Sequence, residues 1–280
     1  VAANAGIDVI LIDQTQEAAD KGKAHCTGLL DKGIARRKVT PEKKDEVLGR
    51  ITATTNLAAL KGCDLIIEAI AERIDWKKSL YAKILPYVSS RAVLASNTSG
   101  LSINALSEVL DESLHHRFCG VHFFNPPRYM HLVELIPCAK TDADVLSALE
   151  AFLVSTLGKG VVTAKDTPNF IANRIGVFSI LSTLHHTAQF GMGFDEVDAL
   201  TGPLIGRPKS ATFRTSDVVG LDTLVHVANG LKSAVPNDEK NALFELPDFI
   251  NHMVENKLLG SKTGAGFYKK VRKEDGSSEI

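Results

Sequence analysis

The stretch FCGVHFFNPPRYMHLVELIP, residues 118–137, contains two short apolar runs separated by a turn. Asn125 and the two prolines after it force the turn, because proline fixes φ and has no N–H to donate to a neighbouring strand. Two strands joined by such a turn bring His122, in the first run, close to Glu134, in the second. The pattern therefore predicts an imidazole and a carboxylate side by side in apolar surroundings.

A histidine beside a carboxylate is typical of a general base with the acid that orients it. Glu134 would keep one imidazole nitrogen protonated, leave the other to accept a proton, and stabilise the imidazolium that results. The alternative is that His122 is an ordinary core histidine, which is the commoner case for a single histidine in an apolar run. The sequence around the turn favours the functional interpretation.

Short apolar runs alternate with helical patterns through the first half of the chain. The runs predict strands at residues 9–12, 51–55, 64–70, 92–95 and 161–163. Helices are expected within residues 16–50, 74–87 and 142–157. Strands of this length that alternate with helices are typical of a doubly wound parallel sheet, so we predict an α/β fold.

Polar residues follow several of these strands, where open α/β sheets bind their ligands. We expect them to share one edge of one sheet. The alternative for each is local, because small polar residues also cap helices, and Thr15 or Asp13 could cap the helix that follows them. The residues are Asp13, Glu72, Asn97, Ser99, His122 and Asn125.

Asp13 closes the first apolar run. In a dinucleotide-binding βαβ unit, an acidic residue at the end of the second strand receives the ribose hydroxyls, about 20 residues after a G-x-G-x-x-G loop. No such loop lies between Val1 and Asp13. We therefore expect the loop and the first strand to precede Val1, and a chain that starts at Val1 to lack a central strand and to be unstable or inactive.

The sequence changes character near Asp166, where helical patterns replace the alternation. Helices are expected at residues 170–190, 195–200, 217–231 and 246–257. We therefore predict an α/β domain at residues 1–165, a helical domain at 166–268, and a polar tail or linker at 269–280.

The composition is that of an ordinary globular protein, with 44% hydrophobic and 23% charged residues among 280. A formal charge of -1 gives no electrostatic reason to expect nucleic acid or an anionic membrane as a partner. The four cysteines form no CxxC pair and lie in or beside apolar runs, which favours thiols in a reducing compartment. No apolar run is long enough to span a membrane, so we predict a cytoplasmic protein.

Five motifs occur in order along the chain: SNTSGLSI, GVHFFNPP, LVELI, KDTPNFIANR and KTGAGFY. Together they resemble the L-3-hydroxyacyl-CoA dehydrogenases of fatty-acid β-oxidation over essentially the whole sequence. The resemblance implies an NAD-binding first domain and a helical second domain that mediates homodimerisation. It also implies an acyl-CoA substrate, NAD as the cofactor, and no metal.

The resemblance also implies roles for individual residues. His122 would be the catalytic base, with Glu134 as its partner. Ser99 would contact both substrate and nicotinamide, while Asn125 and Asn173 would line the substrate site, Asn173 together with Ser99 holding the reacting oxygen. The residues expected to bind NAD are Asp13, Glu72, Lys77, Asn97, Ser99 and Lys262.

Residues 202–216 are longer than the corresponding stretch of the family and look like the branch that is fused to a C-terminal enoyl-CoA hydratase. The basic run at residues 32–38 does not align with the family's CoA contacts, so we assign no CoA ligand there. Two alternatives remain. One is a non-catalytic protein of the λ-crystallin type. The other is a dehydrogenase of another 3-hydroxy acid, which the His–Glu pair disfavours because the related β-hydroxyacid dehydrogenases use a lysine base.

Overall fold

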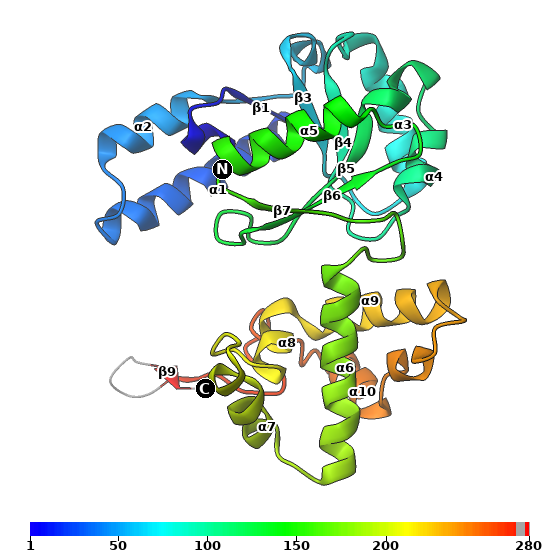
Figure 1. Cartoon of the computed structure of the whole chain (residues 1–280). Helices are drawn as coiled ribbons and strands as arrows, with labels where there is room; N and C mark the ends of the chain where they lie inside the picture. The colour runs from blue at the N-terminus through cyan, green and yellow to red at the C-terminus, as the bar shows by residue number, and fades with distance from the viewer. Residues whose placement is uncertain (273–277, 280) are drawn as a thin grey trace. The chain divides into compact units, whose positions relative to one another are not determined.

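The computed structural model describes residues 1–272 and 278–279 (Figure 1). The chain forms two compact units, Val1–Asp166 and Thr167–Ile280. The first unit contains the strands and helices of an α/β fold, and the second is mainly helical. The predicted fold class is therefore confirmed.

Five strands form the main sheet of the first unit. They are, in spatial order, β3 (Leu65–Glu68), β4 (Val93–Ser96), β5 (Phe118–Phe123), β6 (Leu132–Pro137) and β7 (Gly160–Thr163). Neighbours are parallel except for β5 and β6, which are antiparallel. The antiparallel pair follows from the turn at residues 124–131, because a short turn can join only antiparallel neighbours.

The strands β1 (Val9–Ile12) and β2 (Ile51–Thr54) form a separate parallel pair. Within the described residues no strand lies between β1 and β3. The expectation that Asp13 and His122 share one sheet is wrong for these residues. Asp13 ends a strand of the two-stranded sheet, and strands join one sheet only where their backbones hydrogen-bond.

The helices of the first unit are α1 (Gln16–Ala35), α2 (Pro41–Gly49), α3 (Ile74–Ile84), α4 (Ile103–Glu108) and α5 (Ala143–Ala151). Thr15 caps α1, because its hydroxyl oxygen accepts a hydrogen bond from Ala18 N at 3.2 Å. Asp13 is not needed as the cap. Helix α5 lies across one face of the main sheet (Figure 1), where Leu149 packs with Val121 and Val133.

The second unit packs α6 (Ala172–Phe190), α7 (Phe194–Thr201), α8 (Phe213–Val219), α9 (Leu221–Ala234) and α10 (Asp248–Glu255) around one apolar core. The helix expected at residues 217–231 is two helices, α8 and α9. Gly220 separates them with a φ of 99°, a conformation that side chains with a Cβ rarely adopt.

Asp217 fixes the KTGAGFY motif within this second unit. Its carboxylate accepts hydrogen bonds from Phe267 N at 2.8 Å and from Tyr268 N at 2.9 Å. A Cβ on Gly266 would lie 2.0 Å from Asp217 Oδ1, so only glycine fits there. Burial raises the pKa of Asp217. The glycines of this motif thus serve a tight backbone approach.

The end of the chain contains two short strands, β8 (Val271–Arg272) and β9 (Ser278–Glu279), which pair antiparallel. The polar sequence of the predicted tail did not indicate this ladder. Residues 273–277 and 280, which belong to the same predicted tail, lie outside the described residues.

Candidate active site

His122 and Glu134 lie opposite each other in the antiparallel pair of β5 and β6. Residues directly opposite in such a pair present their side chains on the same face of the sheet. His122 Nδ1 is 2.8 Å from Glu134 Oε2. The two residues are 3% and 0% exposed. The predicted proximity of imidazole and carboxylate is therefore confirmed.

An aromatic ring packs against this pair. The ring of Phe124 lies 4.4 Å from the His122 ring, centroid to centroid. Val121 and Val133, the sequence neighbours of the pair on β5 and β6, are fully buried on the opposite face of the sheet. A carboxylate acceptor places the proton on Nδ1, and low polarity strengthens its interaction with an imidazolium. This arrangement can orient a base and stabilise its charged form.

The loop after β4 lies beside the end of β5. Asn97 Oδ1 accepts a hydrogen bond from Phe123 N at 2.9 Å, so the Asn97 side chain is tied to the residue after His122. Ser99 N donates to Glu72 Oε1 at 2.5 Å, and Thr98 Oγ1 donates to Glu72 Oε2 at 2.7 Å. The structure thus joins the loop to Glu72 on one side and to β5 on the other.

Lys77 lies in the interior of the first unit, with no exposed surface. Its ammonium is 2.7 Å from Glu68 Oε1 and 3.8 Å from Glu72 Oε2. Glu68 was not among the site residues predicted from the sequence. The pattern that pointed to Glu134, a glutamate inside an apolar run, also occurs at Glu68 in LIIEAI.

Glu68 also receives the hydroxyl of Tyr81 at 3.0 Å and that of Ser96 at 2.7 Å. Burial, together with the charge of Glu68, raises the pKa of the Tyr81 phenol far above its ordinary value. Tyr81 therefore stays a donor to Glu68.

Lys159 is a second residue that the sequence analysis missed. Its ammonium donates to the carbonyl oxygens of Pro127 at 2.5 Å and of Met130 at 2.7 Å. These carbonyls belong to the turn between the strands of His122 and Glu134. Lys159 is 6% exposed, and burial lowers the pKa of its ammonium. No local sequence pattern marks it, because its acceptors are backbone atoms.

Asp13 is exposed at the end of β1, where its Oδ1 accepts a hydrogen bond from Gln14 N at 2.7 Å. An exposed carboxylate at a strand end suits the ribose hydroxyls of a dinucleotide. Asn125 is exposed in the turn before β6. The role of Asp13 toward NAD and that of Asn125 toward substrate stay predictions.

Asn173 and Lys262 belong to the second unit. Asn173 lies in the first turn of α6, and the Lys262 ammonium forms an ion pair with Asp222. Their roles toward substrate and NAD stay predictions. In the described residues there is no cluster of three or more acidic, cysteine or histidine side chains that could hold a metal ion. None of the described helices has the length and apolar character that a membrane span requires.

Two family descriptions match the chain. Residues 1–167 match the NAD binding domain of 3-hydroxyacyl-CoA dehydrogenase, and residues 170–270 match its C-terminal domain. A probable 3-hydroxyacyl-CoA dehydrogenase of Bacillus subtilis is 42% identical over 97% of this chain. The chain spans 36% of the length of that relative.

Two further proteins, both named as dehydrogenases of hydroxyacyl-CoA substrates, are similar to this chain. A probable 3-hydroxyacyl-CoA dehydrogenase of Deinococcus radiodurans is 42% identical over 97% of this chain and 78% of its own length. The crystal structure of (S)-3-hydroxybutyryl-CoA dehydrogenase PaaH1 from Ralstonia eutropha is similar with a TM-score of 0.85 and 32% identity, over 95% of this chain and 92% of that one. The chain therefore belongs to the 3-hydroxyacyl-CoA dehydrogenase family, and its first unit contains the NAD-binding domain of that family.

Proposed function

We propose that this chain oxidises L-3-hydroxyacyl-CoA to 3-oxoacyl-CoA with NAD, as a step of fatty-acid β-oxidation. The observation that carries the proposal is the 2.8 Å contact between His122 Nδ1 and Glu134 Oε2, buried in a chain of this family. A base that is held by a carboxylate is what removal of a hydroxyl proton requires.

In this proposal His122 accepts the proton of the substrate's 3-hydroxyl on Nε2. Glu134 holds the Nδ1 proton and stabilises the imidazolium that forms. Ser99 and Asn173 hold the reacting oxygen, and Asn125 lines the substrate site. The bound nicotinamide supplies the hydride acceptor.

Six residues are proposed to hold NAD. Asp13 would accept the ribose hydroxyls, and its charge would repel the 2′-phosphate of NADP. Glu72 and Asn97 lie at the ends of β3 and β4, where a nicotinamide ring would meet Ser99. Lys77 and Lys262 complete the proposed set, Lys77 through its charge rather than by contact, since it has no exposed surface.

The activity is tested with acetoacetyl-CoA and NADH, followed by the loss of NADH absorbance in the full-length protein. Consumption of NADH supports the dehydrogenase. A folded protein that binds NADH but consumes none contradicts it and favours a non-catalytic protein of the λ-crystallin type. Consumption with free 3-oxo acids but not with acetoacetyl-CoA indicates a dehydrogenase of another hydroxy acid. Equal rates with NADPH count against the role of Asp13.

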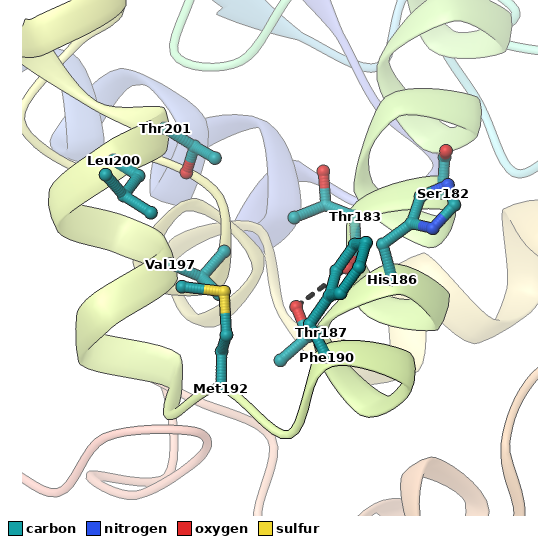
Figure 2. Close-up of a pocket in the computed structure, with 9 residues that line it drawn as sticks. All are labelled: Ser182, Thr183, His186, Thr187, Phe190, Met192, Val197, Leu200 and Thr201. Atoms are coloured by element: carbon teal, nitrogen blue, oxygen red, sulfur yellow. Dashed lines mark hydrogen bonds between the residues drawn. The ribbon is translucent and has the colours of Figure 1, made fainter.

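The second unit is proposed as a dimerisation and substrate domain, and the protein as a homodimer. Large apolar side chains are exposed on this unit, and a hollow between α6 and α7 is lined in part by two of them, Phe190 and Leu200 (Figure 2). Exposed apolar side chains are a common component of protein interfaces. The exposed apolar residues of this unit include Ile175, Phe190, Leu200, Leu204, Ile205, Val218 and Val219.

Sedimentation of the purified protein tests the dimer. Phe190→Asp and Leu204→Asp are expected to give monomers, because a charge in an apolar interface loses its solvation. Tyr129→Asp is the control, since Tyr129 is 66% exposed on the first unit. A monomeric wild type, or a dimer that all three variants preserve, contradicts this interface.

The proposed setting is the cytoplasm, where reduced thiols persist. All four cysteines are free, and Cys119 and Cys138 are buried. Burial raises the pKa of the Cys119 thiol to about 12, so it stays protonated and unreactive.

A further inference from the structure

Glu68 is a buried carboxylate that the proposed reaction does not use. Its oxygen Oε1 accepts from Lys77 Nζ at 2.7 Å and from Ile70 N at 2.6 Å. Its oxygen Oε2 accepts from the hydroxyls of Tyr81 and Ser96. Glu68 O also accepts from Asn97 N at 2.7 Å. Glu68 therefore ties β3 to α3 and to the loop that carries Ser99.

Lys77 lies between two carboxylates. Because it has no exposed surface, its ammonium needs an anion nearby. Glu68 provides that anion at 2.7 Å, whereas Glu72 is 3.8 Å away. As long as Glu68 pairs with the ammonium, Glu72 is not needed as its main anion, and the Glu72 oxygens can accept hydrogen bonds from other groups.

Glu72 uses its oxygens to hold the loop after β4. Oε1 accepts from Ser99 N at 2.5 Å, and Oε2 accepts from the Thr98 hydroxyl at 2.7 Å. The Thr98 hydroxyl oxygen in turn accepts from Leu101 N at 3.0 Å. The position of Ser99 thus depends on where the Glu72 carboxylate lies.

We propose that Glu68 is a positioning residue for the dehydrogenase reaction: it holds the Lys77 ammonium and so keeps the Glu72 carboxylate on the Ser99 loop. This inference rests on the proposed role of Ser99 in contacting substrate and nicotinamide. It follows that the charge of Glu68, rather than its volume, determines the position of Ser99.

The variant Glu68→Gln removes the charge and nearly keeps the shape. The Lys77 ammonium then has Glu72 as its nearest carboxylate and draws it away from Ser99 N. We expect the Ser99 amide to exchange its hydrogen about tenfold faster, as for the loss of one net hydrogen bond. We expect kcat at saturating NADH to fall about 10- to 100-fold, because small misplacements of a reacting group are costly.

Tyr81→Phe is the matched control. It removes one donor from Glu68 but leaves the pair of Glu68 and Lys77 intact, so Ser99 exchange and kcat should stay at wild-type values. A folded Glu68→Gln protein whose Ser99 amide exchanges at the wild-type rate overturns the proposal.

The double variant Glu68→Gln/Lys77→Met separates positioning from a merely structural role. Without the ammonium nothing competes for Glu72, so Ser99 exchange should return toward the wild-type rate. If the two substitutions acted independently on the structure, their effects on Ser99 exchange would instead add. If Glu68→Gln alone fails to fold, the double variant, which buries no unpaired charge, decides: wild-type exchange at Ser99 supports the proposal, and faster exchange overturns it.

Ser99 exchange is measured in the full-length protein without cofactor or substrate. It therefore tests the contact among Glu68, Lys77 and Glu72 separately from the activity. If the variants show these changes in exchange but the wild-type protein consumes no NADH, the proposed function is overturned and the positional effect of Glu68 stands.

Discussion

Glu134 and Glu68 are carboxylates of the same five-stranded sheet, and both are almost completely buried, but they differ in their partners. Glu134 faces the imidazole of His122, whereas Glu68 faces the ammonium of Lys77. Imidazoles gain and lose a proton near neutral pH, while lysine ammoniums stay charged there. The partner of a buried glutamate therefore decides whether the carboxylate assists proton transfer or holds elements of the fold together.

The largest effect is expected from a substitution that breaks the pair of His122 and Glu134. Replacing His122 with glutamine removes the base, so kcat with acetoacetyl-CoA should fall about 10²- to 10⁴-fold. NADH affinity, measured by fluorescence titration, should stay at the wild-type value. His116→Gln is the control, because His116 is exposed on the same unit. Full turnover by His122→Gln would remove His122 from the mechanism.

The second largest effect is expected from a substitution that breaks the pair of Glu68 and Lys77. The variant Lys77→Met leaves a buried carboxylate without its cation, which typically costs about 3–5 kcal/mol of unfolding free energy. Lys43→Met is matched to it, since Lys43 pairs with Glu46 at 3.1 Å on the surface, where solvent screens the pair and it contributes little to stability. Urea denaturation measures both. Equal losses in the two variants would refute the difference between buried and exposed pairs.

A smaller effect is expected at Asn97, which connects the strand of Glu68 to the strand of His122. Asn97 is held by Glu68 O and accepts from Phe123 N, the residue after His122. Asn97→Ala leaves that N–H without its acceptor, so we expect a loss of about 1–3 kcal/mol in unfolding free energy. Asn97→Asp keeps an oxygen in this position and should recover most of the loss. No recovery in the aspartate variant would argue against this hydrogen bond.

The smallest effect is a pH dependence of stability that comes from Lys159, near Glu134. Burial lowers the pKa of Lys159, which holds the turn between His122 and Glu134, below the value of about 10.4 for an unfolded lysine. Between these two pKa values the unfolded chain binds more protons, so the stability contribution of Lys159 rises with pH.

We therefore expect the unfolding free energy of the wild type, relative to Lys159→Met, to increase as the pH rises toward about 10.4. Denaturation curves at several alkaline pH values measure the difference. A difference that is constant or decreases over this range would show that Lys159 is not held in a desolvated position.

The local sequence was sufficient for most elements of the first unit, because short apolar runs and helical spacing mark strands and helices directly. It was less informative in the second unit. The helical pattern of residues 217–231 continues through Gly220, and only the packing there requires the left-handed conformation that divides it.

Sequence patterns were enough to predict the α/β architecture, the helical second half, and the pairing of His122 with Glu134. That pairing was predictable because a short turn forces two adjacent strands to face each other. Tertiary structure alone decided the roles of Glu68, Lys77 and Lys159. Their partners come from separate elements or from backbone carbonyls, and contacts of this kind depend on how the chain packs, which no local pattern encodes.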